Sequence, residues 1–305
     1  MSGDTVFIPP KLARTVTGEF GERGAAWLAR LPEQLREVSE HFRLRVGKPY
    51  QDLSYNYVAR AETEDGTPVV LKLGVPHREL LTEAETLTLY EGAQALVSLL
   101  GGAPDEGVLI LERLEPGTPL REVDDEEATE VVASLMRELR RLPTEDSTLP
   151  TVADWGRGFA RVRALKGSAH EFPAEILDEA ESAFFELDES CDERVVLHGD
   201  LHHWNVCAAA RRPWLAIDPK GVVGDPAYEV GAFLRNPLPE ILAASRPERI
   251  IRRRVEVFSA RLGFPAERLL RWGFAQAVLS ACWGFEGRDE GWRDALRLAE
   301  SFRSV

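Results

Sequence analysis

The stretch VVLHGDLHHWNV, Val195 to Val206, decides how the rest of this sequence is interpreted. Between His198 and Asn205 it holds three histidines, one aspartate and one asparagine. Such a cluster predicts either a metal site built on imidazoles or a loop in which the carboxylate and amide carry the chemistry. The two hypotheses predict different enzymes, and residues elsewhere in the chain separate them.

The imidazole hypothesis has the weaker support. His198 and His202 are four residues apart, the spacing that places two ligands on one face of a zinc-protease helix. However, Gly199 disfavours a helix at this point, and no glutamate occupies the position of a general base. A zinc site also needs a third protein ligand, and the remaining histidines lie in unrelated contexts. A His-based metal-dependent hydrolase is therefore the less favoured alternative.

The other hypothesis is the pattern HxDxxxxN, formed by His198, Asp200 and Asn205. An aspartate at the end of a strand can accept a hydrogen bond from a substrate hydroxyl and orient it. An asparagine five residues later can offer its oxygen to Mg²⁺, which prefers oxygen ligands. Asp218, at the end of the apolar segment WLAID, supplies a second carboxylate. A tight hairpin over residues 208–213 would bring Asp200, Asn205 and Asp218 around one point.

A phosphoryl-transfer enzyme also needs a cation on the phosphates, commonly a strand lysine paired with a helix glutamate. PVVLKLG supplies Lys72 within an apolar strand, where an unpaired ammonium is costly to bury. Glu83 lies on the same helical face as Leu80 and Leu87, so we expect it to point toward the core and pair with Lys72. Glu85 is the alternative partner.

Strand-like and helix-like segments are unevenly distributed along the chain. Residues 53–74 alternate on both sides of EDGT, which predicts a hairpin, and the apolar run 107–114 predicts a buried strand. Helical spacing covers 22–41, where Pro32 favours a split into two short helices. Beyond residue 143 the chain is mainly helical, with two short apolar strands. The predicted class is α+β, with a small antiparallel-sheet N-lobe over 1–114 and a larger, mainly helical C-lobe over 115–305.

Bulk properties exclude several kinds of protein. A net charge of −14 argues against a nucleic-acid binder, because phosphate contacts need clustered Lys and Arg. Uncharged runs such as 92–104 reach 13 residues, short of the ~20 that span a bilayer. Three widely spaced cysteines indicate no disulfide framework. Without a secretory signal, the chain is predicted to be cytoplasmic and away from membranes, and its acidic surface would tolerate cationic small molecules.

The order of Lys72, Glu83, HxDxxxxN and Asp218 resembles the aminoglycoside phosphotransferases, relatives of the protein kinases. The chain is more similar to one branch, the streptomycin 6-phosphotransferase or aminoglycoside/hydroxyurea antibiotic resistance kinase family. The segments that carry this resemblance are WLARLP, DGTPVVLKLG, VLILERLEPGTPL, VADWGRGFARVRA and, most strongly, residues 195–237. The resemblance covers essentially the whole chain. It implies a two-lobed, protein-kinase-like fold, with nucleotide bound by the N-lobe and the acceptor by the C-lobe.

Carried over position by position, the resemblance implies roles for the central residues. Asp200 would be the catalytic base that orients the acceptor hydroxyl. Asn205 and Asp218 would bind Mg²⁺. Lys72, paired with Glu83, would contact the α- and β-phosphates of ATP.

The resemblance also implies supporting residues. His198 would brace the catalytic loop. Asp225, in GDPAYE, would secure backbone amides of that loop, with a role as a helix N-cap as the alternative. The strand 109–111, with Glu112 and Leu114, would form a hinge whose backbone groups recognise adenine.

One departure from the protein kinases concerns the phosphate cover. The first hairpin lacks GxGxxG, so this cover is expected from the backbone of residues 54–56 and from the Ser54 hydroxyl.

The expected reaction is transfer of the γ-phosphoryl group of Mg·ATP to a hydroxyl of a small molecule. A cationic aminoglycoside, such as streptomycin at its 6-hydroxyl, is the first expectation, and another hydroxylated metabolite is the alternative. Glu229, Glu286 and Trp283 are candidates for the acceptor site by their location. Trp283 has a competing interpretation as a helix-packing residue, and the sequence does not indicate an oligomeric state.

Overall fold

A computed structural model describes residues 7–165 and 171–305, so residues 1–6 of the predicted N-lobe lie outside it. The chain divides into two compact units: unit 1 is Met1–Gly92 with Val97–Gly117, and unit 2 is Ala93–Leu96 with Thr118–Val305. Helices and antiparallel strands are both present, which confirms the α+β class. The functional boundary expected after residue 114 stays a prediction.

Unit 1 is built around one antiparallel sheet with strand order β1-β2-β3-β5-β4. Its elements are α1 (Pro10–His41), β1 (Arg45–Pro49), β2 (Tyr57–Glu62), β3 (Pro68–Leu73), α2 (Arg78–Leu89), β4 (Leu99–Ala103), η1 (Pro104–Glu106) and β5 (Val108–Glu112). The predicted hairpin around EDGT joins β2 to β3. Its turn is closed by a hydrogen bond from Thr63 N–H to Thr67 O, 3.0 Å, and Gly66 adopts a φ of 85° there.

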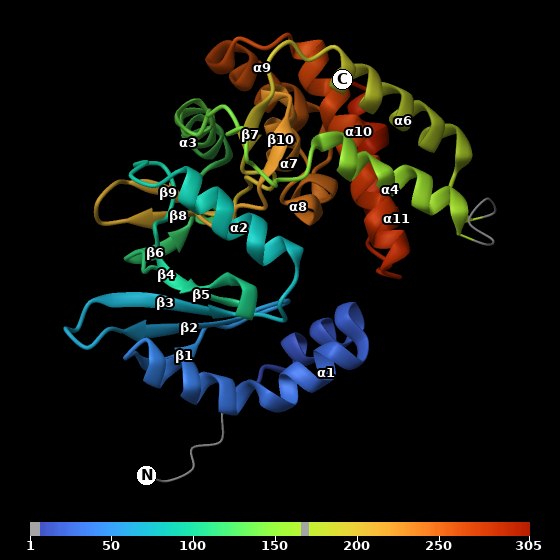
Figure 1. Cartoon of the computed structure of the whole chain (residues 1–305). Helices are drawn as coiled ribbons and strands as arrows, with labels where there is room; N and C mark the ends of the chain where they lie inside the picture. Colours follow the sequence, from blue (N-terminus) through green and yellow to red (C-terminus); the bar gives the residue numbers. More distant parts are fainter. Residues whose placement is uncertain (1–6, 166–170) are drawn as a thin grey trace. The chain divides into compact units, whose positions relative to one another are not determined.

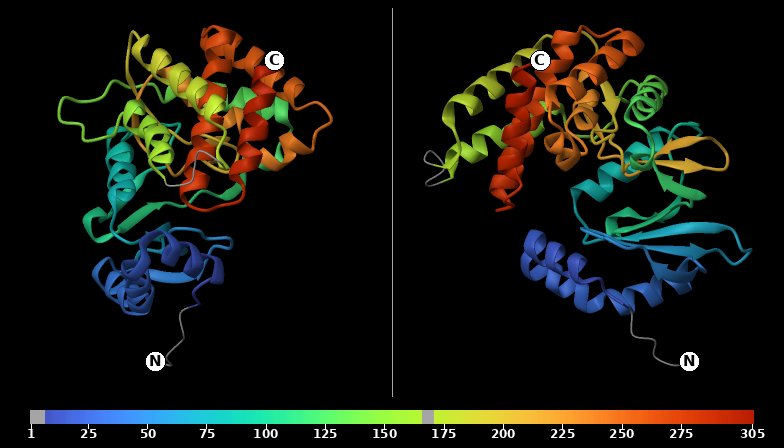
Figure 2. Two further views of the ribbon diagram at one scale, coloured as in Figure 1. Left: turned by 90° about the vertical axis from the view of Figure 1, so that its right-hand side faces the viewer. Right: turned by 180° about the vertical axis from the view of Figure 1, so that it is seen from behind.

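Helix α1 covers one face of this sheet (Figures 1 and 2). Leu31 and Leu35 of α1 share a core with Leu71 and Leu73 of β3. Because side chains alternate along a strand, Lys72 points to the opposite face, where α2 lies. The hydrophobic pattern of β3 thus determines the direction in which its single lysine projects.

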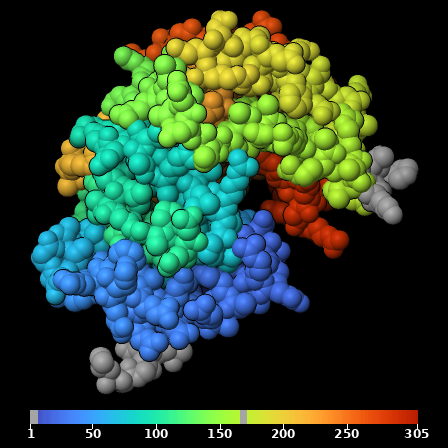
Figure 3. Space-filling model, viewed as in Figure 1, coloured from blue at the N-terminus to red at the C-terminus, as the bar shows by residue number. Residues whose placement is uncertain are grey.

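The structure corrects the expected break in α1. The helix continues through Pro32, and the non-helical backbone occurs at Gly21, with φ 56° and ψ −130°. A proline inside a helix costs about 3 kcal/mol, but burying the neighbouring Leu31 and Leu35 contributes about 1.5–3 kcal/mol each. Glycine accepts a positive φ without steric cost, which explains the site of the kink. The outer side of α1, blue in Figure 3, lies on the surface of unit 1.

Unit 2 is mainly helical, as predicted. From the end of unit 1 onward the elements are β6 (Pro116–Pro119), η2 (Leu120–Glu122), α3 (Asp125–Glu138), α4 (Val152–Ala164), α6 (Ala174–Glu189), β7 (Val195–Leu197), β8 (Val206–Ala209), β9 (Trp214–Ala216), β10 (Val222–Gly224), η3 (Pro226–Glu229), α7 (Val230–Leu234), α8 (Leu238–Ala243), α9 (Pro247–Leu262), α10 (Ala266–Glu286) and α11 (Trp292–Arg303). Helix α10 packs against α4, α6, α7 and α11, and its Trp272 is fully buried.

No helix in the described part of the chain has the length and apolarity of a membrane span.

Two small sheets of unit 2 flank the segment singled out in the sequence. Strand β7 pairs antiparallel with β10, and β8 pairs antiparallel with β9. The hairpin expected over 208–213 is therefore confirmed. Residues 198–205, here named the HGD loop, leave the end of β7 and enter the start of β8. Both ends of this loop are thus anchored in hydrogen-bonded strands.

Candidate active site

The HGD loop is tied at both ends to the segment that carries Asp218. Near its start, His198 O accepts a hydrogen bond from Lys220 N–H, 2.8 Å. At its end, Asn205 O accepts one from Ile217 N–H, 2.9 Å. The loop and residues 217–220 therefore form one framework, on which the predicted carboxylates and amide are mounted.

His198 connects these two segments through its side chain. The residue is 2% exposed, and its Nε2 lies 2.8 Å from Ile217 O. Burial lowers the pKa of the imidazole to about 4, so the ring is neutral at physiological pH. A neutral ring that donates from Nε2 leaves Nδ1 to accept from Asp200 N–H, at 3.3 Å. This geometry matches the brace expected of His198.

Asp200 lies between the guanidinium of Arg235 and the imidazole of His202, whose own pKa is lowered by burial. Its Oδ1 is 3.2 Å from Arg235 Nη2, and its Oδ2 is 3.6 Å from His202 Nε2. Burial raises the pKa of this carboxyl, but its interactions with His202, Arg235 and Lys220 outweigh that effect and hold its pKa below the ordinary value. The carboxylate is therefore ionised at neutral pH and can accept a hydrogen bond. Arg235 was not among the predicted site residues: it lies within the segment 195–237, but only the position of the end of α7 brings it to Asp200.

Asn205 and Asp218 present oxygen atoms on the same framework. Asn205 Nδ2 donates to Asp200 O, 2.9 Å, which leaves its Oδ1 as the acceptor. Asp218 adopts a φ of 58°, a left-handed conformation that aspartate tolerates better than most residues. Its Oδ2 lies 3.6 Å from Lys220 Nζ. One amide oxygen and one carboxylate suit a hard divalent cation that retains some of its water.

The three histidines do not converge on a common point. His198 bonds to Ile217 O, and the His203 ring stacks on Phe233 with a centroid distance of 4.0 Å. Within residues 7–165 and 171–305, no group of three or more His, Cys, Asp and Glu side chains could hold a metal ion. The histidine-based hydrolase therefore lacks a ligand set in the described chain.

Unit 1 contains the predicted lysine–glutamate pair. Lys72 Nζ donates to Glu83 Oε2 at 2.6 Å, and both side chains are buried, with 7% and 5% exposed. The pairing partner is thus Glu83 and not the alternative Glu85. Alternation along β3 sends Lys72 toward α2, and the apolar face of α2 places Glu83 on its buried side. The nucleotide contact expected of this pair stays a prediction.

The sequence that carries these residues corresponds to a known family. Residues 47–287 match the family described as "Aminoglycoside/hydroxyurea antibiotic resistance kinase". The chain belongs to this family. It is 32% identical to a streptomycin 6-kinase of Streptomyces glaucescens, with 92% of each chain covered, and 30% identical to a hydroxyurea phosphotransferase of Kitasatospora aureofaciens, covering 93% of this chain and 82% of that one. The protein is therefore a phosphotransferase that acts on a hydroxyl group.

Solved structures confirm the protein-kinase-like fold of this kinase. It is similar to the choline kinase LicA of Streptococcus pneumoniae, with a TM-score of 0.65, 14% identity, and coverage of 90% of this chain and 100% of that one. It is also similar to a thermostable mutant of the aminoglycoside phosphotransferase APH(4)-Ia in a complex with ADP and hygromycin B. There the TM-score is 0.59 at 16% identity, and 87% of this chain and 97% of the other are covered. At such identities the likeness establishes the fold alone.

Glu229 of the kinase has a different role from the one expected. Its carboxylate is 6% exposed and accepts from His198 N–H at 2.6 Å and from Gly199 N–H at 2.9 Å. Burial raises its pKa to about 7, although these two hydrogen bonds favour the ionised form. A carboxylate occupied in this way is not a wall of the acceptor site. These contacts argue against the expectation that Glu229 binds the acceptor, because the residue instead secures the backbone of the HGD loop.

Asp225 was expected to secure backbone amides of the HGD loop, but its carboxylate bonds to other groups. Its Oδ1 accepts from Ala227 N–H at 2.9 Å, which caps η3. Its Oδ2 accepts from Trp272 Nε1 at 2.6 Å and from Arg268 Nη2 at 2.5 Å. The N-cap alternative is confirmed, and the contact with loop amides is wrong. An Asp-Pro step at a helix start favours a cap, and this was the local signal that distinguished the two acids.

The expected nucleotide-contact residues in unit 1 lie in loops and at a strand end. Ser54 lies in the loop between β1 and β2, and Leu114 follows β5. Glu112 ends β5 and is bonded twice to Ser98: its N–H donates to Ser98 O at 2.9 Å, and its Oε2 accepts from Ser98 N–H at 3.1 Å. The backbone N–H of Glu112 is therefore already used within unit 1. Adenine recognition by this hinge stays a prediction.

The acceptor candidates on α10 have partners within unit 2. Glu286 receives two hydrogen bonds from Arg161, at 2.7 and 3.1 Å. Trp283 packs edge-on against Trp155 of α4, with ring centroids 6.1 Å apart. Trp155 was not among the predicted site residues, yet a Cβ added to Gly199 would lie 2.7 Å from its ring. An aromatic pair thus lies beside the residue that precedes Asp200.

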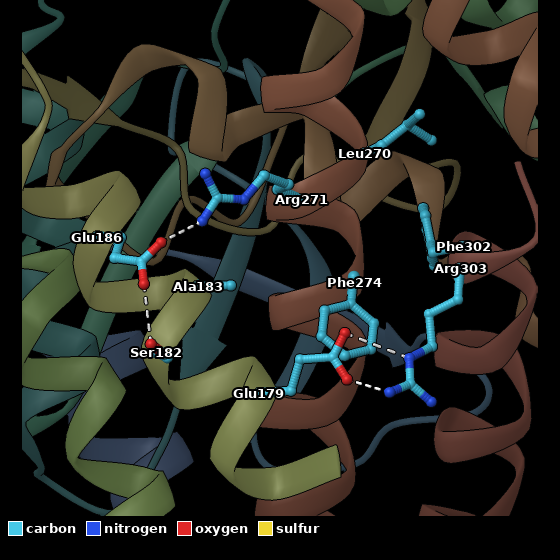
Figure 4. Close-up of a pocket in the computed structure, with 9 residues that line it drawn as sticks. All are labelled: Glu179, Ser182, Ala183, Glu186, Leu270, Arg271, Phe274, Phe302 and Arg303. Atoms are coloured by element: carbon cyan, nitrogen blue, oxygen red, sulfur yellow. Dashed lines mark hydrogen bonds and ion pairs between the residues drawn. The ribbon is translucent and has the colours of Figure 1, made fainter. Parts of the chain in front are cut away.

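Figure 4 shows a hollow on the surface of unit 2, lined by α6, α10 and α11. Its charged groups are paired with one another: Arg271 with Glu186 at 2.5 Å, and Arg303 with Glu179. None of the predicted site residues lines it. The hollow is therefore not part of the candidate active site.

Proposed function

We propose that this kinase transfers the γ-phosphoryl group of ATP to a hydroxyl of an aminoglycoside, with the 6-hydroxyl of streptomycin as the first candidate. The observation that carries the proposal is the single framework that mounts Asp200, Asn205 and Asp218. The similarity of the chain to streptomycin 6-kinases from two Streptomyces species, over more than nine-tenths of its length, supports the choice of acceptor.

ATP would be held with the help of two groups of residues. In unit 1, Lys72 would contact the α- and β-phosphates while Glu83 fixes its ammonium. In unit 2, Asn205 Oδ1 and the Asp218 carboxylate would hold Mg²⁺. Both are the hard oxygen donors that this ion prefers, and the orientation of the Asn205 amide fits that use. The bound ion would neutralise charge on the phosphates.

The chain's own contribution to the chemistry would centre on Asp200. Its carboxylate would accept a hydrogen bond from the acceptor hydroxyl and direct that oxygen at the γ-phosphorus. As the new P–O bond forms and the bond to the ADP oxygen breaks, the hydroxyl proton would pass to Asp200. Because the charges of Arg235 and Lys220 favour the ionised carboxylate, this transfer would come late. Most of the acceleration would come from positioning.

The composition supports a cationic acceptor. The chain carries a net charge of −14, which favours the approach of an aminoglycoside over that of an anion. Trp283 and Glu286 remain the proposed acceptor residues, with Trp155 beside them. Glu229 is excluded from that set because the HGD loop occupies its carboxylate.

The test is release of ADP from Mg·ATP with streptomycin and with other aminoglycosides. We expect turnover with streptomycin, and expect Asp200→Asn to lower kcat at least about 100-fold while ATP still binds. ATP binding is measured separately by calorimetry. An Asp200→Asn variant with near-normal kcat would show that Asp200 is not the base. Absence of Mg·ATP binding by the wild-type chain would exclude the kinase proposal.

Hydroxyurea is the second candidate acceptor. The 30% identity with a hydroxyurea phosphotransferase, over 93% of this chain, is the observation in its favour. The same assay with hydroxyurea compares the two candidate acceptors by their values of kcat/KM. If the enzyme phosphorylates hydroxyurea but not streptomycin, hydroxyurea replaces streptomycin as the proposed acceptor.

A further inference from the structure

A buried arginine outside the residues discussed so far connects three segments of unit 2. Arg254 lies on α9 and is 2% exposed. Its Nε donates to Asp125 Oδ1 of α3 at 3.0 Å, and its Nη2 donates to the same oxygen at 2.5 Å. A buried guanidinium needs such a partner, because burial lowers its pKa and Asp125 opposes that shift. This ion pair alone would be a structural feature.

The remaining guanidinium nitrogen reaches the end of α7. Arg254 Nη1 donates to Phe233 O at 2.9 Å and to Asn236 O at 2.6 Å. The residue between these carbonyls that faces the active site is Arg235, whose Nη2 lies 3.2 Å from Asp200 Oδ1. Arg254 therefore fixes the backbone on both sides of the residue that contacts the proposed base.

Arg254 also contacts the HGD loop. Its Nη2 lies 3.5 Å from His203 Nε2, and the His203 ring stacks on Phe233 at 4.0 Å. The guanidinium carbon of Arg254 lies 4.8 Å from the centroid of the same Phe233 ring. His203 stands between Asp200 and Asn205 in the chain. One guanidinium thus contacts both the loop that carries the base and the helix end that supplies its cationic neighbour.

The adjacent residue provides a natural comparison. Arg253 pairs with the other oxygen of Asp125 at 2.5 Å, and with Glu126 at 3.5 Å. Its side chain is 42% exposed, whereas that of Arg254 is 2% exposed. The hydrogen bonds of Arg253 are to carboxylates on α3, not to α7 or the HGD loop. The two arginines share a carboxylate and differ in their connection to the active site.

We propose that Arg254 is a positioning residue for phosphoryl transfer, which acts by fixing the end of α7 so that Arg235 holds Asp200 in its reactive orientation. The inference rests on the proposed function of Asp200. It requires the planar guanidinium, because an ammonium is a point donor and cannot reach Asp125 and two carbonyl groups together.

The first test compares Arg254→Lys and Arg254→Met with Arg253→Met, using ADP release with streptomycin and Mg·ATP. We expect both Arg254 variants to lower kcat by about 10- to 100-fold, the effect of a misplaced reacting group. The KM for ATP should change less than about 2-fold, since an effect confined to positioning at the base leaves nucleotide binding intact. Arg253→Met should keep the wild-type kcat. Equal kcat losses in Arg253→Met and Arg254→Lys would overturn the proposal.

A double-mutant cycle tests the route through Arg235. If Arg254 acts through Arg235, then adding Arg254→Lys to Arg235→Lys should lower kcat by less than about 3-fold further, because residues that act as a unit are not additive. Full multiplication of the two losses would overturn this route. Arg254→Lys is the principal variant because it retains the ion pair with Asp125 if Arg254→Met fails to fold.

The Asp200→Asn variant separates an error in the proposed function from an error in the inference about Arg254. If Asp200→Asn retains activity, the base is misassigned, whatever the Arg254 variants show. If Asp200→Asn is inactive while Arg254→Lys has the wild-type kcat, the inference about Arg254 alone is wrong.

Discussion

Replacing Glu229 by glutamine separates the two roles considered for this residue. In the structure, one carboxylate oxygen accepts from His198 N–H at 2.6 Å and the other from Gly199 N–H at 2.9 Å. The glutamine amide keeps one acceptor and presents an NH₂ group to the second N–H. Glu229→Gln therefore keeps the volume of the side chain, while one anchor of the HGD loop becomes a contact between two donors.

Two opposing contributions to stability follow from the structure. Burial raises the pKa of Glu229 to about 7 from 4.5, so removing its charge at pH 8 relieves about 3 kcal/mol. The pKa of about 7 already includes the hydrogen bonds to the ionised carboxylate, so the remaining cost is one buried N–H left without an acceptor, about 1–3 kcal/mol. We expect the free energy of unfolding to rise by at most about 2 kcal/mol, because the two contributions largely offset each other.

Activity should not show this cancellation. The residue after Gly199 is Asp200, so the loss of one loop anchor should lower kcat by about 10- to 100-fold through mispositioning of the base. The assays are ADP release with streptomycin at pH 8 and urea unfolding at the same pH. A wild-type kcat combined with a raised KM for streptomycin would contradict this prediction, because it would place Glu229 against the cationic acceptor.

Three further substitutions test other parts of the site. The folded pKa of His198, about 4, lies below its ordinary 6.5, so the stability that the neutral ring contributes is present above pH 6.5 and is lost as the pH falls. Between pH 7.5 and 5, the free energy of unfolding of the wild type, measured in urea, should fall by about 2 kcal/mol relative to that of His198→Gln. The same pH dependence of this free energy in both proteins would contradict the prediction. Gly199→Ala should lower kcat at least about 10-fold, because Gly199 has a φ of 83° and the new Cβ would lie 2.7 Å from Trp155. If the variant releases ADP at the wild-type rate, the HGD loop can shift to accept the methyl group. Asp225→Asn should lower the free energy of unfolding by about 2 kcal/mol, since Trp272 and its other partners lose a charged acceptor. It should leave kcat per folded molecule unchanged, and a large kcat loss would return Asp225 to the HGD loop.

Those parts of the site that depend on local periodicity could be predicted from the sequence. Lys72 points away from the core leucines of β3 because side chains alternate along a strand, and Glu83 lies on the apolar face of α2. The Asp-Gly turn closes the β2–β3 hairpin as expected. Asn205 and Asp218 come together because a short hairpin joins β8 to β9. In each case a few neighbouring residues specify the geometry.

Tertiary structure decided the contacts between segments far apart in the chain. The Asp-Pro step favours Asp225 as a cap, but no local signal indicates that Glu229, at the other end of the same short 3₁₀ turn, reaches the HGD loop. The direction of that turn, set by its packing against β7 and α10, gives the loop amides to Glu229 and the Trp272 indole to Asp225. Arg254 likewise approaches the site from a separate helix. Sequence periodicity specifies which face a side chain occupies, whereas the partner on that face is specified only when distant elements pack together.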